Sequence, residues 1–137
     1  MVSDTFLDSS GFFALLVTRD RMHERSADLI ARAAKSRRRF VTTDYVLGET
    51  ATLLKARGKG HLCTTCFDLV FGASACRVEW MDPDRFAETR RFFLKRHDQD
   101  WSFTDCFSFW IMQEFRLRDA LSTDVHFRQA GFNPLLI

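Results

Sequence analysis

Short apolar runs and longer helical stretches alternate along this chain. The short runs predict strands at residues 5–7, 39–42, 77–80, 120–122 and 135–137. The longer stretches predict helices over residues 12–17, 22–35, 45–57, 61–71, 82–97 and 102–115, with one more helix before the last strand. Helices between successive strands are typical of parallel sheets, because a parallel pair needs a long crossover connection. The pattern therefore predicts an α/β fold whose mainly parallel sheet is covered on both faces.

Composition adds limits to this picture. The chain has 137 residues, of which 46% are hydrophobic, and this is enough for one core. No repeat, low-complexity tract or linker divides the sequence, so we predict a single domain over residues 1–137. The first residues lack the features of a signal peptide, and no early apolar run could span a bilayer. We therefore expect a cytoplasmic protein without membrane contact.

Net charge and cysteine content limit the kinds of ligand that the sequence predicts. The net charge is only +2, so any grip on a polyanion must come from local patches. Cys63 and Cys66, with His61 and Cys76 nearby, could hold zinc. Structural zinc sites, however, usually combine two paired-ligand units, and this chain has one. Reduced thiols packed in the core are the favoured interpretation.

Four acids are predicted at one edge of the sheet. Asp8 directly follows the first strand, and Asp124 follows the fourth. Glu49 lies in the first turns of the helix after the second strand, and Asp105 lies in the first turn of an apolar helix. Ligand sites of open α/β sheets lie beyond the carboxyl ends of the strands. The four carboxylates are therefore expected to face the same space.

Each aspartate also has an ordinary structural explanation. Asp8 and Asp124 could cap the helices that follow them. Ser102 and Asp105 have the spacing of a capping box. Glu49 resists such an explanation, because its helical face carries no basic residue. We expect its carboxylate to be partly buried without a partner, which favours a bound cation.

The ligand set predicts a hard metal ion. The candidate ligands are carboxylate oxygens, and the hydroxyls of Ser9, Thr104 and Thr123 lie close to them in sequence. Oxygen-only coordination suits Mg²⁺ or Mn²⁺ better than Zn²⁺. A bound cation also reverses the sign of the site, so that a phosphodiester can approach it. The acids therefore indicate metal-dependent phosphoryl chemistry.

Four segments in order resemble the motifs of PIN-domain proteins. They are Thr5-Phe6-Leu7-Asp8-Ser9-Ser10, then Thr42-Thr43 through Leu47-Gly48-Glu49, then Phe103-Thr104-Asp105-Cys106, and Ser122-Thr123-Asp124-Val125-His126-Phe127 followed by Gly131-Phe132. The resemblance spans nearly the whole chain, and the length suits the stand-alone VapC-type toxins. Cys106 departs from the small aliphatic residue often found after the third acid, which leaves the carboxylates unaffected.

The resemblance implies both a fold and an activity. The fold would be a PIN-like three-layer α/β/α sandwich with four to five strands. The activity would be that of an Mg²⁺- or Mn²⁺-dependent endoribonuclease, the toxin of a toxin–antitoxin pair. Asp8, Asp105 and Asp124 would hold the metal directly, and Glu49 directly or through water. Ser9, Thr104 and Thr123 would orient these ligands. Homodimers and inhibition by a separately encoded antitoxin are implied as well.

Other residues and other functions stay open. Arg37, Arg38 and Arg39 could contact RNA phosphates or form a solvated helix end. His126 is left out of the catalytic set, because a mechanism of four carboxylates does not require it. Trp80 is expected in the core, and Trp101 in the core, at a dimer contact or stacked on a base.

Two alternative functions fit the same sequence. One is a non-catalytic PIN-like module that binds RNA or protein. The other is a DNA nuclease or phosphatase, since carboxylates act on the phosphate and not on the sugar.

Overall fold

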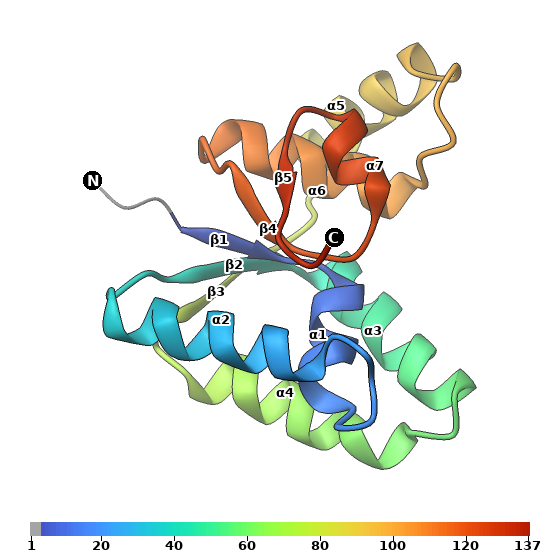
Figure 1. The fold of residues 1–137 in the computed structure, drawn as a ribbon. Helices are drawn as coiled ribbons and strands as arrows, with labels where there is room; N and C mark the ends of the chain where they lie inside the picture. The colour runs from blue at the N-terminus through green and yellow to red at the C-terminus, as the bar shows by residue number, and fades with distance from the viewer. Residues whose placement is uncertain (1–3) are drawn as a thin grey trace.

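Five parallel strands form one central sheet in the computed structural model, which describes residues 4–137 (Figure 1). The strands are β1 (Thr5–Leu7), β2 (Phe40–Thr43), β3 (Cys76–Glu79), β4 (Asp119–Leu121) and β5 (Asn133–Pro134). Their order is β3-β2-β1-β4-β5, and every recorded pairing is parallel. The predicted α/β class with a mainly parallel sheet is confirmed. Because the chain extends to one side of β1 and then to the other, a topological switch point lies between β1 and β4.

Helices cover both faces of this sheet. They are α1 (Ser9–Leu16), α2 (His23–Lys35), α3 (Asp44–Ala56), α4 (Cys63–Gly72), α5 (Pro83–Lys95), α6 (Phe103–Glu114) and α7 (Val125–Gln129), with a 3₁₀ turn η1 at Gly60–Leu62. Figure 1 shows α1, α2 and α4 on one side and α5, α6 and α7 on the other. This arrangement is the predicted three-layer sandwich. None of the helices within residues 4–137 has the length and apolarity to cross a bilayer.

Aromatic side chains fill much of the core. Phe127 of α7 packs at 6.2 Å from Phe6 of β1 and at 5.0 Å from Phe109 of α6, between ring centroids. Trp101 is buried, and its indole N–H donates to Gln129, so the structure favours the core interpretation of this residue. The prediction for Trp80 is wrong, since this side chain is 55% exposed. It follows β3, which is an edge strand and offers no neighbouring strand to cover it.

Helix α1 begins earlier than predicted and packs closely on the sheet. The predicted helix starts at residue 12, but Ser9, Ser10 and Gly11 already belong to the first turn of α1. A Cβ atom at Gly11 would lie 2.0 Å from the carbonyl oxygen of Leu121 in β4. Only glycine permits this approach of helix and strand. The close contact fixes the residues after β1 against those after β4.

The last strand also differs from its prediction. The apolar residues 135–137 were expected to form it, whereas β5 consists of Asn133 and Pro134. Leu136 is buried in the core. The apolar run at residues 135–137 therefore indicates a buried segment and not a paired strand. An apolar run of three residues cannot distinguish the two.

The cysteines are free thiols, and two of them are core residues. Cys66 and Cys106 are buried, while Cys63 and Cys76 are half-buried. Burial raises the pKa of Cys66, Cys76 and Cys106 to about 11. These three thiols are therefore protonated at neutral pH.

Candidate active site

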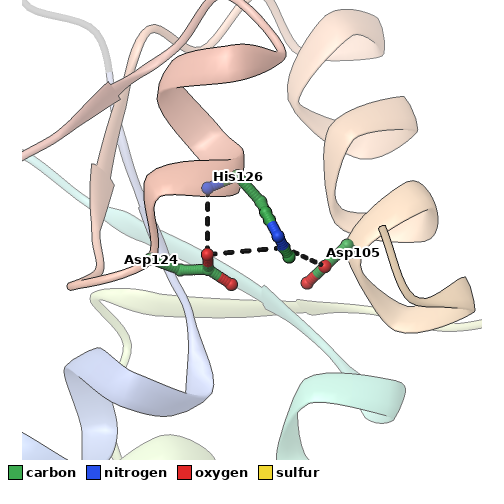
Figure 2. A group of neighbouring side chains, drawn as sticks. All are labelled: Asp105, Asp124 and His126. Atoms are coloured by element: carbon green, nitrogen blue, oxygen red, sulfur yellow. Dashed lines mark hydrogen bonds and ion pairs between the residues drawn. The ribbon is translucent and has the colours of Figure 1, made fainter. Parts of the chain in front are cut away.

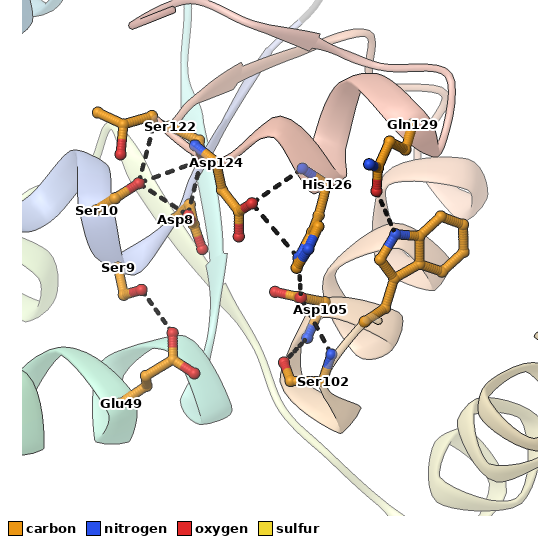
Figure 3. A network of polar contacts seen from close by, with 12 residues as sticks. Asp8, Ser9, Ser10, Glu49, Ser102, Asp105, Ser122, Asp124, His126 and Gln129 are labelled. Carbon is orange, nitrogen blue, oxygen red and sulfur yellow. Dashed lines mark hydrogen bonds and ion pairs between the residues drawn. The ribbon is translucent and has the colours of Figure 1, made fainter. Parts of the chain in front are cut away.

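The four predicted acids point into one space at the carboxyl edge of the sheet (Figure 3). Asp8 directly follows β1, and Asp124 is the N-cap of α7 after β4. Asp105 lies in the first turn of α6, and Glu49 lies in the second turn of α3. This space is the crevice at the topological switch point, where open α/β sheets bind ligands.

Asp8 is the most deeply buried of the four carboxylates, with 4% of its surface exposed. It holds the N-cap position of α1 but makes no side-chain cap bond, so the capping interpretation is wrong for this residue. Its Oδ2 instead accepts hydrogen bonds from Ser122 Oγ at 2.8 Å and Ser10 Oγ at 3.0 Å. Burial raises the pKa of Asp8 to about 6, although these two hydrogen bonds oppose the shift. The site therefore contains a carboxylate whose charge is costly without a cation.

Asp105 is fixed by the predicted capping box. Its backbone N–H donates to Ser102 Oγ at 3.0 Å, and its Oδ2 accepts from the Ser102 N–H at 3.1 Å. The same Oδ2 lies 3.0 Å from His126 Nδ1. Burial raises the pKa of Asp105, and the nearby charge of Asp124 adds to the effect. The capping role and a ligand role are thus compatible, because they leave the second carboxylate oxygen available.

His126 lies between two of the acids (Figure 2). Its Nδ1 is 3.4 Å from Asp124 Oδ1 and 3.0 Å from Asp105 Oδ2. Asp124 Oδ1 also accepts from the His126 backbone N–H at 2.9 Å, which confirms Asp124 as a helix cap. Potential ligand atoms of the three residues lie within 4.8 Å of one another. The sequence analysis left this histidine out of the catalytic set, although its position two residues after Asp124 was a signal for it.

Glu49 contradicts the expectation that it is partly buried without a partner. Its side chain is exposed, and its Oε1 accepts a hydrogen bond from Ser9 Oγ at 2.5 Å. The face of α3 that carries it borders an open cavity and not the core, as the exposure of Gly48 also indicates. The argument for a cation therefore rests on Asp8 and Asp105, whose burial is costly, and no longer on Glu49.

The hydroxyl groups around the acids differ in part from the predicted set. Ser9 contacts an acid, as described above. Thr104 lines the cavity beside α3, but within residues 4–137 its side chain makes no hydrogen bond. Thr123 takes part through its backbone N–H, which donates to Ser10 Oγ at 3.0 Å. Ser10 and Ser122 were missed, although each lies two residues from a predicted acid.

The three arginines suggested for RNA contact lie elsewhere. Arg37, Arg38 and Arg39 precede β2, at the amino edge of the sheet, and the carboxylates are at its carboxyl edge. Arg38 pairs with Asp119 at 3.5 Å, at the start of β4. The structure does not bring these side chains to the acids, and their contact with RNA stays a prediction.

The residues present fit a divalent cation. Asp8, Asp105 and Asp124 converge from three different elements, and burial disfavours the charged form of the first two. Like charges at such proximity are stabilised when a cation binds between them. Their oxygen atoms are the ligands that hard cations prefer. The arrangement is suited to holding a cation against the phosphate of a substrate.

Comparisons with known proteins agree with this geometry. The PIN domain family model matches residues 5–133. The 23S rRNA-specific endonuclease VapC20 of Mycobacterium tuberculosis, from two strains, is 29% identical over 127 residues, which cover 93% of this chain and 94% of that protein. The crystal structure of VapC20, described as a sarcin–ricin loop cleaving toxin, matches with a TM-score of 0.81 at 26% identity and covers 94% of this chain and 96% of that one.

Proposed function

Because the chain belongs to the PIN-domain family, we propose that it is a divalent-metal-dependent endoribonuclease and the toxin of a toxin–antitoxin pair. The observation that carries the proposal is the convergence of Asp8, Asp105 and Asp124 at the switch point of the sheet. The similarity to an RNA endonuclease over more than nine-tenths of both chains supports RNA as the substrate. The reaction is hydrolysis of a phosphodiester bond.

Each residue of the site has a proposed role. Asp8, Asp105 and Asp124 would hold the cation, and Glu49 would contribute directly or through water. When bound, Mg²⁺ or Mn²⁺ supplies charge stabilisation for the phosphate and lowers the pKa of a water molecule. The hydroxyl groups that donate to these acids would orient the carboxylate oxygens, and this gives the metal ligands a defined geometry.

Ribosomal RNA is the substrate class that we propose first. VapC20 is a 23S rRNA-specific endonuclease, and its crystal structure is that of a sarcin–ricin loop cleaving toxin. The test incubates purified protein with ribosomes, with a hairpin of the sarcin–ricin loop sequence, and with the same hairpin made of DNA. Mg²⁺ or Mn²⁺ is added in parallel reactions. Cleavage of RNA but not DNA supports the proposal, and cleavage of DNA alone overturns it.

Variants link cleavage to the site. We expect Asp105→Asn to reduce the rate about 100-fold or more, since the cation contributes several kcal/mol to transition-state stabilisation. Asp119→Asn is the matched control, because this acid lies at the opposite edge of the sheet, where it pairs with Arg38. Equal activity of wild type and Asp105→Asn would show that the carboxylates are not the active site. Calorimetric titration distinguishes the non-catalytic module, which would bind no divalent ion.

An antitoxin and a second copy of the chain are the proposed protein partners. An apolar cavity of about 220 Å³ lies between α1, α2 and α4, and its walls include Phe12, Leu15, Ile30 and Leu69. An amphipathic antitoxin helix could place apolar side chains there. Co-expression with the product of a neighbouring reading frame should give a complex that Leu69→Asp disrupts. Sedimentation of the toxin alone tests the homodimer.

The extent of the domain and its location also belong to this proposal. The family match over residues 5–133 and the single sheet support one nuclease domain over residues 1–137. The first three residues of that range lie outside the described ones. A cytoplasmic location, where ribosomal RNA would be available, stays a prediction.

A further inference from the structure

Two cavities flank the carboxylates along α3. The larger, of about 780 Å³, is lined by residues that include Tyr45, Glu49 and Thr104. The smaller, of about 200 Å³, is lined by Ser10, Phe13, Asp20, Leu53, Arg57 and Thr123. Leu53 is a wall of both cavities, so they form neighbouring parts of one surface beside α3. Glu49 lines the larger cavity, and Thr123, the neighbour of Asp124 in the chain, lines the smaller one.

Two walls of the smaller cavity are next to the proposed metal ligands. Ser10, one of its walls, donates a hydrogen bond to Asp8 Oδ2 at 3.0 Å. Thr123, another wall, immediately precedes Asp124 and donates its N–H to Ser10. A group bound in this cavity would therefore lie next to a group bound at the acids.

Arg57 brings a positive charge to the smaller cavity. It follows the last residue of α3, and its guanidinium carbon lies 5.8 Å from the centre of the Phe13 ring. Within residues 4–137 the guanidinium forms no ion pair, not even with Asp20 of the same cavity. The aromatic ring restrains the side chain without neutralising it. Its hydrogen-bond donors are available to a ligand.

A positive charge in the smaller cavity would favour a polyanion beside the acids. The acids repel a polyanion until a metal ion binds, and the whole chain carries a net charge of only +2. Among the described residues that line the two cavities, Arg57 is the only cationic one. A guanidinium presents several N–H groups in a planar fork, which matches the oxygens of a phosphate.

We propose that the cavity of Ser10, Phe13, Arg57 and Thr123 binds a backbone phosphate of the RNA, adjacent to the phosphate that is cleaved. The inference rests on the proposed ribonuclease function and adds the position of the substrate. None of the described residues that line the larger cavity is cationic. The RNA backbone would therefore have a charged contact on one side of the cleaved phosphate and none on the other. Arg57 is therefore a substrate-binding residue that fixes one side of the RNA backbone.

The experiment compares Arg57→Gln and Arg57→Lys with wild type. Arg118→Gln is the matched control, because it removes an exposed arginine directly before β4, at the opposite edge of the sheet. Cleavage of an RNA substrate gives kcat and KM over a series of salt concentrations. Anisotropy of a labelled RNA in Ca²⁺, with a gel to show that the RNA stays intact, gives binding separately. Circular dichroism checks the fold of each variant.

We expect Arg57→Gln to raise KM and the dissociation constant about tenfold, with kcat within about threefold, because one charged phosphate contact is lost. The slope of log affinity against log salt should become shallower by about 0.7, as for one phosphate of a single strand. Arg57→Lys should retain the slope, because the charge is kept. Arg118→Gln should match wild type in all three quantities.

The outcomes separate this inference from the proposed function. Unchanged KM, binding and salt slope in Arg57→Gln, with normal cleavage by wild type, would overturn the phosphate subsite alone. Binding that depends on Arg57 without any cleavage would support the subsite and overturn the ribonuclease. An equal loss in Arg118→Gln would show a general effect of charge and refute the specific cavity. Absence of both binding and cleavage in wild type refutes both.

Discussion

Replacing Asp8 with asparagine should stabilise the metal-free protein at neutral pH. The Asp8 carboxyl is 4% exposed, and burial raises its pKa from 3.8 to about 6. Asparagine keeps the shape of the side chain and an oxygen that can accept from Ser10 and Ser122. It removes the buried charge, which no protein cation neutralises at this position in the described chain.

The magnitude follows from the pKa shift. A raised pKa means that the folded state binds the proton more tightly than the unfolded state does, so deprotonation destabilises the fold. The shift of Asp8 from 3.8 to about 6 corresponds to a cost of about 3 kcal/mol at pH 7. The cost is absent below about pH 4, develops as the pH rises to about 6, and is constant above. For a chain of this size it amounts to roughly 10 °C in Tm.

Urea unfolding in EDTA at pH 4 and pH 7 measures the effect. We expect Asp8→Asn to be more stable than wild type at pH 7 and nearly equal at pH 4. Asp28→Asn serves as the control, because its exposed pair with Arg32 on α2 contributes less than about 1 kcal/mol. A variant that is less stable than wild type at pH 7, or a difference that does not depend on pH, would refute the reasoning.

Three further predictions concern the fold and the cation. Gly11→Ala should lower the free energy of unfolding by about 3 kcal/mol, because its Cβ would lie 2.0 Å from the Leu121 carbonyl oxygen. Ser122→Ala should reduce metal affinity or cleavage about 10- to 100-fold, because it removes the 2.8 Å hydrogen bond to Asp8. Mg²⁺ at about 100 times its dissociation constant should stabilise the wild type by about 2.7 kcal/mol in a thermal unfolding assay.

Each of these predictions has its own control. Gly48→Ala meets no atom within 4 Å and should be neutral or stabilising in α3, and a similar result for Gly11→Ala would contradict the close approach. Ser36→Ala should cleave at nearly the wild-type rate, since this hydroxyl donates to Arg32 O at the end of α2, away from the acids. Equal stabilisation of wild type and Asp105→Asn by Mg²⁺ would argue that the ion binds elsewhere.

The sequence predicted the architecture because its signals are local. Hydrophobic periodicity gave the strands and helices in their correct order, with small errors at the ends such as β5. The positions of Asp8 and Asp124 after strands placed them at one edge, since parallel strands end together. The capping box of Ser102 and Asp105 lies within four consecutive residues and could be identified from spacing alone.

The contacts within the site could not be identified in this way. The Oγ atoms of Ser10 and Ser122 lie 3.1 Å apart, although 112 positions separate the two residues in the chain. Their contact depends on the pairing of β1 with β4 and on the close approach at Gly11. The register of β1 against β4 cannot be predicted from residues that are close together in the sequence. The exposure of Glu49 likewise depends on which face of α3 borders a cavity.

The sequence by itself thus determined the fold class and the four acids, because strand ends and motif positions follow from the order of residues. Tertiary structure alone decided that Ser10 and Ser122 donate to Asp8, that His126 lies between two acids, and that Arg57 shares a cavity with Ser10. The physical reason is that burial and hydrogen bonding depend on which side chains meet across the layers. These contacts are fixed by strand order, strand register and helix packing, and not by residues that are neighbours in the chain.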